Sequence, residues 1–173
     1  MVDGQEEIHD YSYHKKRLGQ EENIRMRLAL FQPDIAQNTG AIIRLCACLG
    51  VPLDVIEPCG FVFDDEKLRR VGMDYIDHVD ITRHFSWQHF LDSVEDSRLI
   101  LLSTKSSGNY TEFSFAKSDI LLLGRESAGV PAEVAARCDG MVKIPMRGEV
   151  RSLNVAMAGA IILSEALRQT ELL

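Results

Sequence analysis

The sequence lacks any apolar segment long enough to cross a membrane. Its apolar stretches, such as residues 99–102 and 120–123, fall far short of the roughly 20 residues that a transmembrane helix requires. The first 25 residues also lack the apolar centre of a secretory signal. We therefore expect a cytoplasmic protein that has no membrane partner.

Cysteines are few and lie far apart in the sequence. The four residues are Cys46, Cys48, Cys59 and Cys138. They form no C-x-x-C pair, and no histidine follows at zinc-finger spacing. We expect reduced thiols that pack as small hydrophobic residues, and no metal.

Basic residues are also fewer than acidic residues. The chain has 19 Lys and Arg against 26 Asp and Glu, which gives a formal net charge of −7. This balance excludes a protein that holds nucleic acid by its overall positive charge, but it leaves local basic patches possible.

The remaining composition is that of a globular protein. With 173 residues, of which 46% are hydrophobic and 26% charged, the chain fits one ordinary domain. Residues 1–25 are charged and poor in apolar side chains, which predicts a flexible N-terminal extension. Residues 26–173 are the predicted single domain, and Met26 is a possible alternative start.

Short apolar runs alternate with helix-length segments after residue 26. Strands are predicted at residues 27–31, 53–56, 98–103, 120–123 and 141–144, and helices at residues 40–49, 65–72, 86–94, 131–137 and 153–169. Most of these strands are apolar on both faces, which is typical of a parallel sheet. The expected fold class is therefore α/β, a mainly parallel sheet flanked by helices.

Two of these helices are too apolar for burial on one side only. Residues 155–163 are apolar through more than two turns, and Arg44 is the only charge between residues 40 and 49. A homodimer formed through residues 40–49 and 153–169 would bury both helices. Alternatively, both helices lie beneath other helices of a monomer.

The segment 123–131 follows an apolar strand and leads into a helix, which is where α/β proteins bind ligands. Val130 stands where a P-loop needs lysine, the dinucleotide pattern G-x-G-x-x-G is absent, and Ser127 lacks the preceding glycine of a nucleophile elbow. What remains is a loop of small residues with one carboxylate, Glu126. A plain strand-to-helix turn would look the same.

Two further loops carry arginine next to a predicted helix start. Arg147 and Arg151 precede the last helix, where two guanidinium groups would form an anion site. Arg44 lies one turn into the helix that we expect Asn38 or Thr39 to cap. An arginine in apolar surroundings needs an anionic partner, either a ligand or a carboxylate of the core.

Together these segments resemble the three motifs of the SPOUT, or α/β-knot, RNA methyltransferases of the TrmH-like branch. The matching residues are Asn38-Thr39-Gly40 with Arg44, then 124–131, then Ile144-Pro145-Met146 with Ser152-Leu153-Asn154. The resemblance extends from residue 26 to about residue 169. Within the branch, residues 31–35, 56–58 and 64–70 are most similar to the enzymes that methylate the ribose of nucleotide 34 in tRNA.

The resemblance implies a deep C-terminal trefoil knot, an S-adenosylmethionine site and a homodimer. General topology rules alone would favour an unknotted sheet. The implied cofactor-binding residues are Leu102, Ser103, Thr104, Gly124, Glu126, Ile144, Met146, Ser152 and Leu153. The implied catalytic residues are Arg44, Asn38 and Asn154, with Arg44 next to the target ribose.

The implied substrate is the 2′-hydroxyl of the wobble nucleotide, cytidine or uridine 34, in the tRNA anticodon loop. The candidate RNA-binding residues are Lys67, Arg69, Arg70, Arg147 and Arg151, with Tyr75 and Trp87 as candidates for base stacking. The basic run at 67–70 could also be a solvated helix face. Alternative functions are ribose methylation of rRNA or of another tRNA position, and RNA binding without catalysis.

Overall fold

A single parallel sheet forms the centre of the molecule. The computed structural model describes residues 25–63, 73–94, 97–148 and 152–173. The six strands are β1 (Arg27–Phe31), β2 (Leu53–Ile56), β3 (Ile81–His84), β4 (Leu99–Leu102), β5 (Ile120–Leu123) and β6 (Gly140–Val142). Their order is β3-β2-β1-β5-β4-β6, and every pairing is parallel. The predicted α/β class is confirmed.

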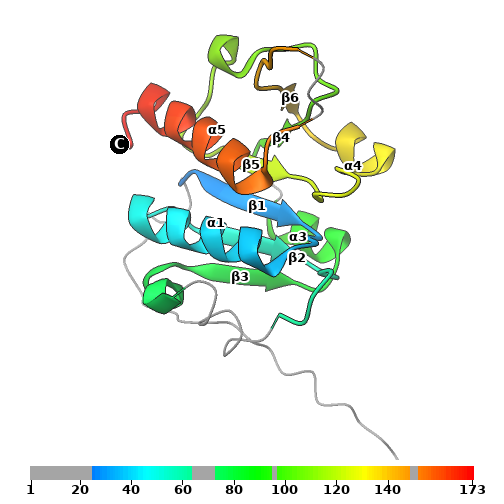
Figure 1. The fold of residues 1–173 in the computed structure, drawn as a ribbon. Coiled ribbons are helices and arrows are strands. Elements are labelled where there is room, and N and C mark those ends of the chain that lie inside the picture. Colours follow the sequence, from blue (N-terminus) through cyan, green and yellow to red (C-terminus); the bar gives the residue numbers. More distant parts are fainter. Residues whose placement is uncertain (1–24, 64–72, 95–96, 149–151) are drawn as a thin grey trace, which may run out of the picture.

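Helices cover both faces of the sheet (Figure 1). They are α1 (Ala36–Leu49), α3 (Trp87–Ser93), α4 (Ala132–Ala136) and α5 (Val155–Gln169), with 3-10 helices η1 (Met73–His78) and η2 (Tyr110–Glu112). Helices α1 and α5 lie side by side over one face. No helix formed by the described residues is both long and apolar enough to span a bilayer.

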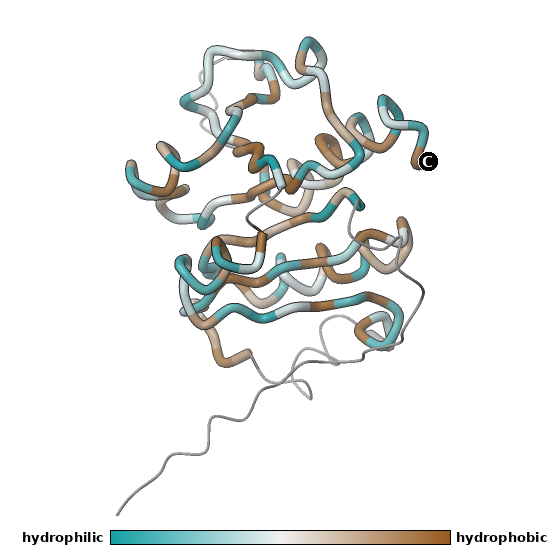
Figure 2. The backbone as a smooth tube through the Cα atoms, turned by 180° about the vertical axis from the view of Figure 1, so that it is seen from behind, coloured by the Kyte–Doolittle hydropathy of each residue, from teal (hydrophilic) through white to brown (hydrophobic). Residues whose placement is uncertain are grey.

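Alternate residues of each central strand enter two separate cores. Leu28 and Leu30 of β1 pack with α1 and α5, whereas Ala29 and Phe31 pack in the core of α3 and α4. Seen from behind, apolar residues recur along both strands and helices (Figure 2). Burial on both faces explains why the inner strands are apolar runs without alternation.

Some predicted helix boundaries are wrong. Helix α1 begins at Ala36, so Asn38 and Thr39 lie inside it and neither is its N-cap. Other caps are clear in the structure: Ser86 accepts from the His89 N–H before α3, and Asn154 caps α5. The helix predicted at residues 65–72 lies outside the described residues.

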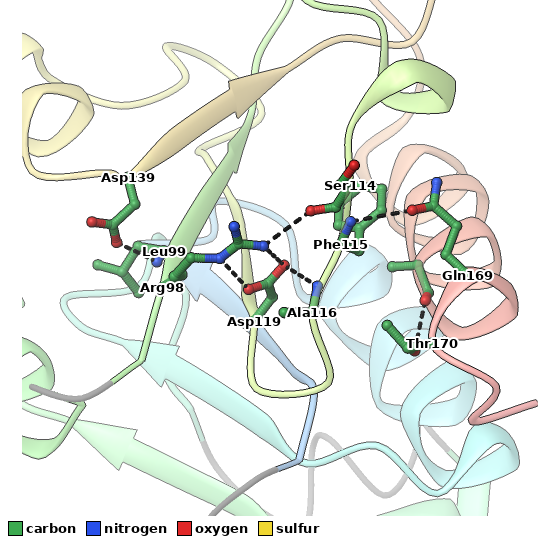
Figure 3. A network of polar contacts seen from close by, with 10 residues as sticks. Arg98, Leu99, Ser114, Phe115, Ala116, Asp119, Asp139, Gln169 and Thr170 are labelled. Carbon is green, nitrogen blue, oxygen red and sulfur yellow. Dashed lines mark hydrogen bonds and ion pairs between the residues drawn. The ribbon is translucent and has the colours of Figure 1, made fainter.

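The strands begin at an edge held by ion pairs, which we call the amino edge. Arg98 donates from Nε and Nη2 to the two carboxylate oxygens of Asp119, at 2.8 and 2.7 Å (Figure 3). Asp119 also accepts from the Ala116 N–H at 2.8 Å, and its side chain is fully buried. The Phe115 N–H donates to Gln169 at the end of α5 at 3.1 Å. Together these bonds join β4, β5 and α5.

A second ion pair lies beneath the other half of the sheet. Arg27 donates to both carboxylate oxygens of Asp54, at 2.8 and 2.6 Å. Asp54 also contacts Nε2 of the buried His84 at 2.7 Å. Because these bonds cross from β1 over β2 to β3, they tie three neighbouring strands together.

The trefoil knot stays a prediction. The connection from β6 to α5 would have to pass through the loop between β4 and β5, and residues 149–151 of that connection lie outside the described residues.

Candidate functional site

A pocket of about 940 Å³ lies where the central strands end. We call this side of the sheet the carboxyl edge. The chain leaves β1 toward β2 and leaves β5 toward β6, in opposite directions along the sheet. Such a switch point opens a crevice between the two loops that follow the strands. The pocket uses this crevice, since it is lined by Asn38 after β1 and by residues 123–130 after β5.

The structure brings the predicted cofactor residues together. Leu102, Ser103, Thr104, Gly124, Glu126, Ile144, Met146, Ser152 and Leu153 all line this one pocket. Asn38 and Asn154, two of the three predicted catalytic residues, line it as well. These residues are far apart in the sequence, so the fold alone makes them neighbours.

Gly124 is required by the loop itself. A Cβ at this position would lie 2.7 Å from the backbone carbon of Gly129, closer than real Cβ contacts come. Arg125 and Gly129 exchange two backbone hydrogen bonds of 2.9 Å, which close the loop into a tight turn. The lack of a side chain at Gly124 therefore serves the turn, and Gly124 also lines the pocket, as a cofactor-binding residue would.

Three side chains join α1, the loop after β5 and the start of α5 in one line of hydrogen bonds. The Asn38 amide donates to Oε1 of Glu126 at 3.0 Å. The Asn154 amide donates to Oδ1 of Asn38 at 2.9 Å. Oδ1 of Asn154 then accepts from the N–H of Ala156 at 2.9 Å and caps α5.

The carboxylate of Glu126 fixes the direction of this line. A carboxylate can only accept hydrogen bonds, so Asn38 must turn its NH₂ toward Glu126 and its oxygen toward Asn154. Asn154 must then present its own NH₂ to Asn38, which leaves its oxygen free to cap α5. One charged group thus orients two amides and one helix end.

Asp34 belongs to the site, although its sequence motif indicates no role for it. Its backbone N–H donates to Oε2 of Glu126 at 2.8 Å. Its carboxylate accepts from Arg125 and from Ser127 on either side of Glu126. The hydrogen bonds to Arg125 and Ser127 lower the pKa of Asp34 to about 2. An aspartate just before a helix is a common capping residue, so this position carried no distinguishing signal.

Arg44 does not line the pocket of its own chain. It is exposed on α1, its guanidinium lies 4.7 Å from the ring centre of Tyr75, and its Nη2 is 3.4 Å from the Tyr75 hydroxyl. Arg44 therefore lies over one face of the ring of Tyr75, a candidate for stacking bases. Trp87, the other candidate, stacks on Phe90 with 5.4 Å between ring centres.

Only one of the predicted RNA-binding residues can be placed. Arg147 is exposed in the loop after β6. Lys67, Arg69, Arg70 and Arg151 lie outside the described residues. Within the described ranges, no three His, Cys, Asp or Glu side chains gather as metal ligands would.

Known proteins are similar to this chain in sequence and in fold. A protein of Beijerinckia indica subsp. indica named tRNA (cytidine(34)-2′-O)-methyltransferase is 57% identical over 144 residues, which cover 82% of this chain and 90% of that protein. A solved structure, described as giving insights into 2-OH methylation of cytidine or uridine 34 on tRNA, has a TM-score of 0.79 and 42% identity. That match covers 85% of this chain and 97% of the other.

A second solved structure is the SpoU methyltransferase AviRb from Streptomyces viridochromogenes in complex with the cofactor AdoMet. It has a TM-score of 0.78 and 30% identity, over 85% of this chain and 61% of that chain. The SpoU rRNA Methylase family matches residues 25–164. The resemblance found in the sequence is thereby confirmed: the chain belongs to the SpoU methylase family.

Proposed function

We propose that this protein transfers a methyl group from S-adenosylmethionine to the ribose 2′-hydroxyl of nucleotide 34, cytidine or uridine, in tRNA. The observation that carries the proposal is that all the cofactor residues expected from the sequence line one pocket. The names of the relatives support the substrate, because the protein of Beijerinckia indica acts on cytidine 34 of tRNA by its name.

The pocket suits a nucleoside with a short polar tail. Its volume of about 940 Å³ lies within the range of small-molecule sites. Ile144, Met146 and Leu153 supply apolar walls, and Ser103 and Thr104 supply polar groups. S-adenosylmethionine would bring an activated methyl group on its sulfonium sulfur and leave as S-adenosylhomocysteine.

We propose that Arg44 orients the target hydroxyl and the phosphate next to it. A guanidinium stays protonated at neutral pH and cannot accept the hydroxyl proton, so its role is to position and not to act as a base. In this reaction the hydroxyl oxygen would form the new bond to the methyl carbon as the bond from that carbon to the sulfonium sulfur breaks, and the hydroxyl proton would leave for water. Proximity and orientation then supply most of the acceleration.

A homodimer would complete this site. The exposed positions of α1 include Ala41, Arg44 and Cys48, and those of α5 include Met157, which is 60% exposed. A partner packed on this face would cover the apolar side chains. It would also bring the Arg44 of each chain to the boundary between the subunits. Light scattering should give a dimer, and a monomer at micromolar concentration would exclude this interface.

We further propose that residues 26–173 are the working domain, preceded by an extension, and that the anticodon loop is held by Arg147 together with Lys67, Arg69, Arg70 and Arg151. Strand β1 begins at Arg27, close to the proposed domain start. Lysine and arginine contacts to phosphates would supply affinity that falls with rising salt. Acting on tRNA, the protein would work in the cytoplasm.

Nucleoside mass spectrometry of tRNA from cells that lack the protein tests the function. The expected result is the loss of 2′-O-methylcytidine or 2′-O-methyluridine at position 34. Unchanged tRNA with a missing methyl group in rRNA, or at another tRNA position, would identify the alternative substrates. If calorimetry shows that the protein does not bind S-adenosylmethionine, RNA binding without catalysis becomes the better explanation.

The variant Arg44→Lys tests the role of the guanidinium. Lysine keeps the positive charge but loses the planar fork that contacts two oxygens at once. We expect methyl transfer to tRNA to fall at least about tenfold, the effect of roughly 1.4 kcal/mol, with unchanged affinity for S-adenosylmethionine. Full turnover by Arg44→Lys would contradict the proposed role of Arg44.

A further inference from the structure

We propose that Asp34 is the positioning residue of the cofactor pocket, and that it acts by clamping the loop that carries Glu126. This inference rests on the proposed function for the identity of the ligand. Its structural part concerns only how Glu126 is held in place.

The Asp34 carboxylate accepts hydrogen bonds from the residues on both sides of Glu126. Oδ1 of Asp34 accepts from Nε of Arg125 at 3.0 Å and from Nη2 at 2.5 Å. Oδ2 accepts from the Ser127 N–H at 3.1 Å and from the Ser127 hydroxyl at 2.6 Å. All of these partners are donors, so an ionised carboxylate fits this position better than any neutral side chain.

The same residue also holds Glu126 directly. The Asp34 N–H donates to Oε2 of Glu126, while Oε1 of Glu126 accepts from Asn38. Asp34 lies two residues before α1 and Asn38 lies in its first turn, so the carboxylate of Glu126 is held between two points at the start of this helix. If the clamp opens, Glu126 loses its fixed place, and the amides of Asn38 and Asn154 lose their orientation.

The clamp also gives the positive charge of Arg125 a structural role. This guanidinium lies in the loop that lines the pocket and would otherwise be a candidate for binding RNA phosphate. Its Nε and Nη2 both donate to the Asp34 carboxylate, which neutralises it. Arg125 therefore belongs to the pocket wall, in contrast to the exposed Arg147.

The variant Asp34→Asn tests the clamp, because an asparagine NH₂ would face Arg125 or Ser127, which are themselves donors. Glu165→Gln is the matched control. Glu165 is also bonded to one arginine, Arg168, and its pKa is likewise lowered to about 2, but it lies on α5 outside the pocket lining. The two variants thus remove the same kind of ion pair in two places.

We expect Asp34→Asn to raise the dissociation constant and the KM for S-adenosylmethionine about tenfold. We expect a smaller fall in kcat at saturation, because the amides of Asn38 and Asn154 also lose their orientation. Glu165→Gln should leave all three values unchanged, and both variants should lower Tm by a similar small amount. Binding by Asp34→Asn as tight as that of the unmodified chain would overturn the proposal.

A crystal structure of Asp34→Asn separates this inference from the proposed function. We expect Glu126 to leave its contact with Asn38, which is 3.0 Å in the unmodified chain. If Glu126 keeps that contact, the clamp is wrong whatever the ligand is. If Glu126 moves in the variant but the unmodified protein does not bind S-adenosylmethionine, the clamp is supported and the proposed cofactor is wrong.

Discussion

The amino edge and the carboxyl edge of the sheet carry the same kinds of charged side chain, but these side chains serve different purposes. At the amino edge, the side chain of Asp119 is fully buried and bonded to Arg98. The side chain of Asp54, inside β2, is likewise fully buried and bonded to Arg27. At the carboxyl edge, the side chain of Asp34 is 17% exposed and bonded to loop residues around the pocket. Burial therefore differs between the edges more than chemistry does.

This difference separates stability from function. A buried carboxylate that loses its partner is left without solvent, so the amino-edge pairs should matter most for folding. A carboxylate near the surface can be solvated by water, so its loss costs little stability but changes how a loop is placed. We expect variants at the amino edge to lower the free energy of unfolding, and variants at the carboxyl edge to lower the activity.

The largest expected effect is that of Arg98→Met. It leaves the buried Asp119 without its ionic partner and also removes the bond from Arg98 to the Ser114 carbonyl. We expect a loss of about 3 kcal/mol in the free energy of unfolding. For a domain of this size, that loss corresponds to a fall in Tm of about 10 °C. Chemical denaturation and thermal melting measure both quantities.

Arg168→Met is the control for this prediction. Arg168 is also paired with a carboxylate, Glu165, but its side chain is 67% exposed. Its replacement should cost less than about 1 kcal/mol. Equal losses for the two arginine variants would contradict the distinction between the buried amino edge and the surface.

Glu126→Gln should have the next largest effect, and on activity instead of stability. The glutamine has one oxygen and one NH₂, but Asp34 and Asn38 both donate to position 126. One donor must then face another, either at Asp34 or, if the amides turn, at Asn38, Asn154 or the start of α5. We expect methyl transfer to fall about 30-fold, equivalent to about 2 kcal/mol.

Thermal melting checks that Glu126→Gln acts locally, and its Tm should stay within about 2 °C of the unmodified protein. Glu133→Gln is the control, because Glu133 is exposed on α4 and outside the pocket lining. It should change neither activity nor Tm. Unimpaired methyl transfer by Glu126→Gln would show that the direction of the hydrogen-bond line is unimportant.

The inner strands could be predicted because burial on both faces makes their sequences mostly apolar. Strands β1, β2 and β5 have the predicted bounds, and only Arg27 and Asp54 interrupt their apolar runs. Strand β3 was missed because Thr82 and Arg83 interrupt its apolar pattern. β3 is an outermost strand of the sheet, and fewer residues of such a strand need to be apolar because it is less buried.

The residues that form the site could be predicted from the sequence, but the hydrogen bonds between them could not. The motifs identified Asn38 and Glu126, yet Asn38 was expected to cap a helix, which is the usual local role of such a residue. Its amide instead bonds Glu126, 88 positions later in the chain. Asp34 was missed for the same reason, because its partners Arg125 and Ser127 are remote in sequence. Local sequence cannot show a contact that the fold creates.

The smallest expected effect is a pH dependence that separates the stability contribution of Asp34 from its role in binding. The pKa of Asp34 is lowered from 3.8 to about 2, chiefly by hydrogen bonds to Arg125 and Ser127. A lowered pKa stabilises the folded state above pH 4, and this stabilisation is lost as the pH falls toward 2. The Tm gap between the unmodified chain and Asp34→Asn should therefore be constant near neutrality, at about 2 °C, and about halved at pH 3.

Glu165→Gln should show the same closing gap, because the bond to Arg168 likewise lowers the pKa of Glu165 to about 2. The two carboxylates would then agree in how acid removes their stabilisation and differ only in cofactor binding at neutral pH. A gap for Asp34→Asn that persists at pH 2 would mean that its destabilisation does not come from the lost charge. Agreement in stability with a difference in binding would assign the carboxyl edge to function, because stability alone cannot distinguish the two positions.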